Sequence, residues 1–219
     1  MPFRVCRFRS TCLAVLALLA AFPLAARAQL MTFDTVESGS WGMSYGTEAG
    51  QLIFSESGVD VYIHEFMHGE TPLFGWLRVQ ESAYGFGTHQ VLEMGNVCLR
   101  FDFQNLRFQP ATVSLKFTDF GPSQNPENVR VNGMEMYWQD LIALDGSTIA
   151  MDVLVSAVPD PSGPGDAGTV TFEGIIWELW IGGQEFCIDD LDAAPEDTPS
   201  ALTTWGAVKS LFAVSTLAH

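Results

Sequence analysis

The stretch from Thr169 to Leu191 constrains the fold more than any other part of the chain. Thr169–Glu173 and Gln184–Leu191 alternate polar and apolar residues, and Ile175–Ile181 between them is rich in β-branched and aromatic residues. Glycines interrupt these runs, and the pair Gly182-Gly183 predicts a two-residue hairpin turn. Alternation with tight turns is typical of antiparallel strands that bury one face. The stretch therefore predicts three antiparallel strands, the last of which closes a β-sandwich.

The same pattern of short apolar runs and turn residues continues through the rest of the chain. Met136–Leu144 and Thr148–Val158 predict a further pair of strands, joined by Asp145-Gly146, a dipeptide typical of hairpins. Regularly spaced short strands without a clear amphipathic helix predict one all-β domain, an antiparallel β-sandwich over residues 29–192. The other predicted strands are Leu30–Thr35, Gln51–Ser55, Val59–Phe66, Trp76–Gln80, Val97–Phe103, Thr112–Asp119 and Asn128–Asn132.

The two ends of the chain differ in composition from this domain. Residues 1–28 combine a basic start, a short apolar run and the small-residue site Ala26-Arg27-Ala28, which together predict a secretory signal peptide. We therefore expect an exported protein, either secreted or held at the cell surface. Residues 193–200 predict a linker, because they are small, acidic and rich in proline. Residues 201–219 predict a tail that would dock on the sandwich, fray, or act as a recognition or sorting peptide.

The charge of the chain restricts its partners. It contains 26 Asp and Glu against 10 Lys and Arg, and removal of residues 1–28 leaves six bases against 26 acids, a formal charge near −20. This acidity excludes nucleic-acid binding and disfavours anionic membrane surfaces. It favours divalent cations, since calcium takes carboxylate oxygens, although solubility alone would also explain it. Asp34 lies near the end of the first predicted strand, and Asp189 and Asp190 lie at the end of the last. The three would form a structural calcium site if these strands are neighbours.

Two cysteines remain after residues 1–28 are removed, Cys98 and Cys187. Alternation places each on the polar face of its strand, Cys98 beside Arg100 and Cys187 beside Glu185. If the two strands are neighbours in one sheet, a disulfide can form, and an exported protein meets an oxidising environment. The sequence therefore favours a disulfide over two free thiols.

The segment HEFMH at residues 64–68 matches the H-E-x-x-H motif of zinc hydrolases. On a helix, His64 and His68 would bind zinc and Glu65 would act as general base. Here the motif continues a strand-like run, and the glycine and proline that follow would end a helix at once. A second possible zinc set is His64, His68 and His89, but residues four apart on a strand are separated by about 13 Å. Surface histidines are the simpler explanation.

Aromatic residues in loops and at strand ends are candidates for stacking on sugars. Trp41 and Tyr45 lie in a segment rich in Gly and Ser, and Trp76 begins a short predicted strand. Packing in the core is the alternative role for such residues. The sequence has no nucleophile elbow, phosphate-binding loop or dinucleotide-binding motif. It therefore predicts a binding module, with Trp41, Tyr45 and Trp76 as the candidate ligand-binding residues.

The segments FDTVESG, ESGVDVYIHEF, LRFDF, VSLKFTDFG and TFEGIIWELWIGGQEFCIDDL occur in this order along the chain. With them the chain resembles, over residues 31–191, a group of secreted bacterial β-sandwich proteins that often carry C-terminal sorting signals and have no established activity. The resemblance implies a jelly-roll sandwich similar to carbohydrate-binding modules, in which the closing I-D-D strand often helps to hold a structural calcium. Relatives commonly carry an aromatic residue at the position of Cys187, and the tail TTWGAVKSLF is similar to short C-terminal segments of exported proteins.

The sequence thus predicts an exported, non-catalytic module that binds carbohydrate or another cell-surface polymer and holds a structural calcium. A zinc-dependent hydrolase using His64, Glu65 and His68 is one alternative. A purely structural surface protein without a small ligand is the other.

Overall fold

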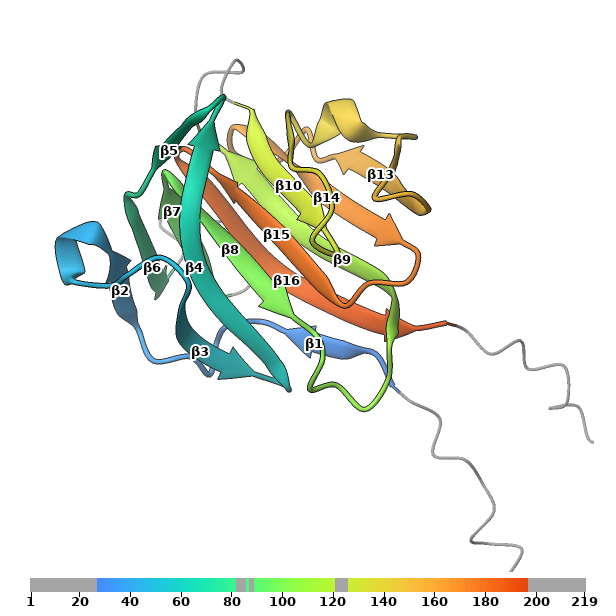
Figure 1. The fold of residues 1–219 in the computed structure, drawn as a ribbon, viewed down its shortest axis with the longest axis horizontal. Coiled ribbons are helices and arrows are strands. Elements are labelled where there is room, and N and C mark those ends of the chain that lie inside the picture. Colours follow the sequence, from blue (N-terminus) through green and yellow to red (C-terminus); the bar gives the residue numbers. More distant parts are fainter. Residues whose placement is uncertain (1–26, 82–85, 87–88, 121–125, 197–219) are drawn as a thin grey trace, which may run out of the picture.

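The computed structural model describes residues 27–81, 86, 89–120 and 126–196, and in Figure 1 these residues form two layers of antiparallel strands. The nine-stranded sheet, here sheet A, has the order β12-β13-β14-β9-β16-β7-β6-β2, with β1 also paired to β16. The seven-stranded sheet, here sheet B, has the order β11-β10-β15-β8-β4-β3, with β5 paired to β4. The predicted all-β sandwich is confirmed, whereas the jelly-roll topology stays a prediction.

Most strands have eight residues or fewer, as the spacing of turn residues predicts, and β4, β9 and β16 have ten each. Two 3-10 helices also occur in the described residues, η1 (Met43–Tyr45) and η2 (Ile142–Leu144). No helix in this part of the chain is long and apolar enough to cross a membrane. The strands are β1 Gln29–Met31, β2 Gly39–Gly42, β3 Gln51–Glu56, β4 Val59–His68, β5 Thr71–Leu73, β6 Trp76–Glu81, β7 Gln90–Gly95, β8 Val97–Asp102, β9 Pro110–Asp119, β10 Glu127–Val131, β11 Tyr137–Gln139, β12 Thr148–Ile149, β13 Val153–Pro159, β14 Asp166–Glu173, β15 Glu178–Gly183 and β16 Phe186–Pro195.

The core lies between the two sheets and follows from the alternation of apolar residues. In β8, for example, Val97, Leu99 and Phe101 are fully buried and belong to one core cluster with side chains of both sheets. Burial of each such side chain stabilises the fold by about 1.5–3 kcal/mol. The largest fully buried side chains are Phe33, Phe66, Phe101, Phe103, Phe117, Phe172, Phe186, Met31, Ile63, Leu77, Leu92 and Met94.

The hairpin predicted at Gly182-Gly183 is wrong, because both glycines belong to strand β15. β14 and β16 lie in sheet A and β15 lies in sheet B, so the chain crosses between the sheets twice in this stretch. A Cβ on Gly182 would lie 2.2 Å from the carbonyl oxygen of Val97, so glycine is required there for close pairing with β8. The turn lies instead at Gln184 and Glu185, and Glu185 has a left-handed φ of 54°.

The hairpin predicted at Asp145-Gly146 is also wrong. β11 pairs with β10 in sheet B, whereas β12 and β13 pair with each other in sheet A. The predicted strand Met136–Leu144 is only the three-residue β11 followed by η2, because Leu141 and Leu144 are buried in the core from the connecting segment. A dipeptide that favours a turn therefore marks a crossing between sheets here.

The first and last strands of the sandwich lie side by side, which is the condition set for the predicted calcium site, with Met31 opposite Leu191. β1 is shorter than the predicted strand Leu30–Thr35. The predicted linker 193–200 begins too early, because β16 continues to Pro195 and Ala193 pairs with both β1 and β9. Residues 1–26 of the predicted signal peptide and the predicted tail 201–219 lie outside the described residues.

Candidate functional site

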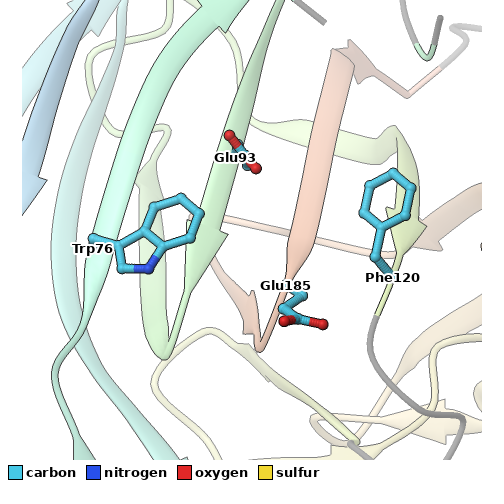
Figure 2. Close-up of a pocket in the computed structure, with 4 residues that line it drawn as sticks. All are labelled: Trp76, Glu93, Phe120 and Glu185. Carbon is cyan, nitrogen blue, oxygen red and sulfur yellow. The ribbon is translucent and has the colours of Figure 1, made fainter. Parts of the chain in front are cut away.

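A cavity of about 240 Å³ opens on the outer face of sheet A. Its described lining consists of Trp76 on β6, Glu93 on β7, Phe120 just after β9 and Glu185 between β15 and β16 (Figure 2). Leu77, Leu92 and Met94 beside them point into the core, so alternation turns Trp76 and Glu93 outward. Four chain segments that are far apart in the sequence thus meet at this cavity.

The Trp76 ring is held in place by its neighbours on the sheet. Trp76 pairs with Gly95 on β7, and a Cβ on Gly95 would lie 2.8 Å from the indole ring. Gly95 therefore leaves the space in which the ring lies. The guanidinium of Arg78, two residues along β6, stands 4.6 Å from the centroid of the ring and also hydrogen-bonds the Tyr45 hydroxyl. These contacts fix a large aromatic surface at the cavity.

The two carboxylates of the cavity are positioned by different contacts. Glu93 is half-buried and accepts a hydrogen bond from the side-chain amide of Gln80. Glu185 is exposed on the turn before β16, and its carbonyl oxygen accepts a hydrogen bond of 3.0 Å from the backbone N–H of Phe120. That bond ties two lining residues together. Neither carboxylate forms an ion pair with any residue that the structure describes.

Cys187 lies next to this cavity in a small apolar cluster with Phe86, Val91 and Phe120 on the outer face of sheet A. Cys98 lies on β8 in sheet B, so the two thiols belong to different sheets and both are free. The predicted disulfide is therefore wrong. Burial raises the pKa of Cys187 to about 12, with a further contribution from Glu93 and Asp119, and burial also raises the pKa of Cys98. Both thiols stay protonated at neutral pH.

The other two predicted ligand-binding aromatics lie elsewhere. Trp41 on β2 is half-buried and packs against Phe54, with ring centroids 6.2 Å apart. Tyr45 in η1 is 49% exposed, and hydrogen bonds from Arg78 and Ser40 lower the pKa of its hydroxyl. Of the three aromatics, Trp76 is therefore the one that lines the cavity.

The structure does not gather the three predicted calcium ligands into one site. The carboxylate of Asp34 accepts a hydrogen bond of 3.0 Å from the backbone N–H of Gln90, at the start of β7. Asp190 forms an ion pair of 2.6 Å with Lys116, and the buried Asp189 accepts the backbone N–H of Asp190. The described residues contain no group of three or more His, Cys, Asp and Glu able to hold a metal ion. Calcium binding stays a prediction.

His64 lies on a strand, as predicted, and His68 does too, because β4 extends two residues beyond the predicted strand Val59–Phe66. β4 carries both, and their rings contact different tryptophans: His64 lies 4.0 Å from the Trp180 ring and His68 lies 5.2 Å from the Trp138 ring. His89 precedes β7 in sheet A and is exposed. The segment is a strand and lacks the helical arrangement that the zinc hydrolase motif requires. The described residues contain no group of three or more His, Cys, Asp and Glu that could hold a metal ion. The two histidines of β4 pack on aromatic rings of sheet B.

We expect acid to destabilise the protein through His64. Burial and the charges of Arg100 and Arg130 lower the pKa of His64 to about 4. An unfolded chain takes up this proton below about pH 6.5 while the folded chain does not, so stability is lost as the pH falls from about 6.5 to 4. For this half-buried side chain the loss is at most about 2 kcal/mol. Urea unfolding at pH 7 and pH 4.5 measures this loss. The free energy of unfolding should fall less between these two pH values in His64→Gln than in the unchanged protein.

His68→Gln is the matched control, because His68 lies on the same strand but is exposed. It should keep the acid sensitivity of the unchanged protein. An identical pH response in the His64 and His68 variants would contradict the role of His64.

A second group of acids lies inside the sandwich, at the end where β9 and β10 meet. Asp119 follows the core-facing Phe117 on β9, and Glu127 precedes the core-facing Val129 on β10, so the two lie on the inner faces of opposite sheets. Asp119 is 5% exposed and Glu127 is 3% exposed. Their side chains hydrogen-bond each other, and Glu127 also accepts the backbone N–H of Leu141 at 3.1 Å.

Burial, together with the charges of Asp119 and Asp140, raises the pKa of Glu127 to about 8. A pair of buried carboxyl groups this close shares a proton at neutral pH. The acid pair thus joins the two sheets in its protonated form.

Comparisons with known proteins leave the site to be interpreted from its own geometry. The sequence matches no family model, and it matches no curated protein.

Proposed function

We propose that this chain is an exported, non-catalytic module that binds carbohydrate through the cavity of Trp76. The observation that supports the proposal is the combination of a fixed indole ring with two outward carboxylates in one cavity. Sugars present an apolar C–H face, which packs on an aromatic ring, and hydroxyl groups, which donate hydrogen bonds to carboxylates. The cavity of about 240 Å³ is slightly smaller than most ligand pockets, which suits a single sugar unit of a polymer.

Export through the predicted signal peptide and a structural calcium near Asp34, Asp189 and Asp190 are parts of the same proposal. They are supported by the composition of residues 1–28 and by the acidity of the chain. Calcium would have to displace the ammonium group of Lys116 from Asp190. The calcium content of the purified protein tests directly whether the ion is bound.

We expect Trp76→Ala to abolish or strongly weaken glycan binding. A central tryptophan in a ligand site commonly contributes about 2 kcal/mol or more, so the affinity should fall by at least about thirtyfold. A glycan array first identifies a bound sugar, and isothermal titration with that sugar then compares the variant with the unchanged protein.

The control is Trp177→Ala, which removes a tryptophan that is 43% exposed in the segment between β14 and β15. It should leave the affinity unchanged. If the array gives no signal, or if both variants lose the same affinity, the proposal is contradicted and a purely structural surface protein is favoured.

A further inference from the structure

The lining of the Trp76 cavity is unusual in its charge. Its described residues are two aromatic rings and two carboxylates, and none of them is a cation. Glu93 has the neutral Gln80 as its hydrogen-bond partner, and Glu185 has no ion pair within the described part of the chain. Arg78 on β6 pairs in register with Glu93, and its guanidinium stands 4.6 Å from the centroid of the Trp76 ring, so one positive charge lies beside the lining. The two carboxylates outnumber this charge, so the described lining is negative on balance.

The negative field extends beneath the cavity. Glu93 and Asp119 both raise the pKa of the neighbouring Cys187 thiol, because each disfavours a second negative charge close by. The whole mature chain adds to this field with its formal charge near −20. A uronic acid or a sulfated sugar would be repelled from such a site. A cationic ligand would be attracted to it.

A bare divalent cation fits the lining less well than an organic ammonium group. Calcium takes six to eight oxygen ligands, whereas half of the described lining residues are aromatic rings. A sugar that carries an ammonium group fits both kinds of lining residue. Its N–H groups donate hydrogen bonds to the carboxylates, and its C–H face packs on the aromatic rings. We propose that the cavity selects glycans that carry free amino groups, with Glu93 and Glu185 binding the ammonium and Trp76 binding the sugar face.

This inference rests on the proposed carbohydrate binding and adds the charge of the ligand. Its test compares two ligands of equal length, a glucosamine hexamer with free amines and the fully N-acetylated hexamer. Titration calorimetry at pH 6, where the amines are protonated, and in the presence of a chelator measures both affinities on the full exported chain. We expect the free-amine hexamer to bind at least tenfold more tightly than the N-acetylated one.

Three variants separate the contribution of the carboxylate charge from that of the aromatic ring. Glu185→Gln should reduce the preference for the free amine to less than about threefold, because the neutral amide still accepts hydrogen bonds from sugar hydroxyl groups but no longer attracts an ammonium group. Trp76→Ala should lower the affinity for both hexamers. Glu173→Gln removes the same charge from an exposed position on β14, away from the cavity lining, and should keep the full preference.

Hexalysine tests whether net charge alone explains the binding. If hexalysine binds as tightly as the glucosamine hexamer and Trp76→Ala leaves its affinity unchanged, general attraction to an acidic protein accounts for the result and the inference is wrong. Equal affinity for the two hexamers would also overturn it, while Trp76-dependent binding of a neutral sugar would still support the proposed function. Binding of no glycan at all would contradict both.

Discussion

Replacing Gly182 by alanine should prevent folding or destabilise the protein by more than about 3 kcal/mol. A Cβ at this position would lie 2.2 Å from the carbonyl oxygen of Val97 and 2.5 Å from Cα of Cys98. Both atoms belong to the backbone of β8, so no side-chain rotation relieves the overlap. Relief requires β15 and β8 to separate, and these strands form the middle of sheet B, with six residue pairs in register. Urea unfolding monitored by tryptophan fluorescence measures the change.

Gly146→Ala is the matched control, because it lies in a turn where an added Cβ meets no atom within 4 Å. Its φ of 72° makes alanine mildly unfavourable, so we expect a loss of about 1 kcal/mol. If the two variants lose equal stability, Gly182 behaves as a turn glycine and the strand assignment of β15 is wrong.

This contrast shows why strands were easier to predict than their pairing. Alternation in the sequence reflects one buried face, and it located β4, β8, β9 and β16 within a few residues. The partner of a strand is fixed by contacts with residues far along the chain. Gly182 and Gly183 serve a close approach between strands, yet in the sequence they look the same as a hairpin turn. The unpredicted strands β2, β5 and β7 are short or lack regular alternation.

The candidate site was predictable only in part, for the same reason. Trp76 could be singled out from the sequence because it begins a short predicted strand, where an aromatic ring is a candidate for stacking on sugars. Glu93, Phe120 and Glu185 do not stand out among 26 acids and 16 phenylalanines. They meet because β16 pairs with both β7 and β9, which brings three distant segments to one edge of the cavity. Similarly, the cysteines share the polar-face pattern but lie in different sheets.

Glu127→Gln should make the protein more stable at alkaline pH and leave its stability near pH 4.5 almost unchanged. Glu127 has a pKa raised from 4.5 to about 8 in the folded protein, chiefly by burial. Between these values the unfolded chain has released the proton that the folded chain keeps. The folded state therefore loses about 1.4 kcal/mol of stability for each pH unit as the pH rises through this window. Glutamine is neutral at every pH and removes this loss.

Glutamine also preserves the contacts of the protonated acid. Its carbonyl oxygen can accept the backbone N–H of Leu141, and its amide can donate to Asp119, as the protonated carboxyl group does. We therefore expect Glu127→Gln to exceed the unchanged protein in free energy of unfolding by at least about 2 kcal/mol at pH 8.5. Urea unfolding at pH 4.5, 6.5 and 8.5 gives the three values, and Glu173→Gln, at an exposed acid of β14, should follow the unchanged protein throughout.

The opposite signs of the two titrations locate the pH of greatest stability. His64 lowers stability as the pH falls below about 6.5, and Glu127 lowers stability as the pH rises from 4.5 toward 8. The two effects overlap between pH 4.5 and 6.5, so the unchanged protein should be most stable in or near this interval. In Glu127→Gln the decline on the alkaline side should disappear while the acid decline due to His64 remains. If Glu127→Gln instead shifts stability equally at all three pH values, the acid pair is ionised in the folded protein and does not join the sheets through a shared proton.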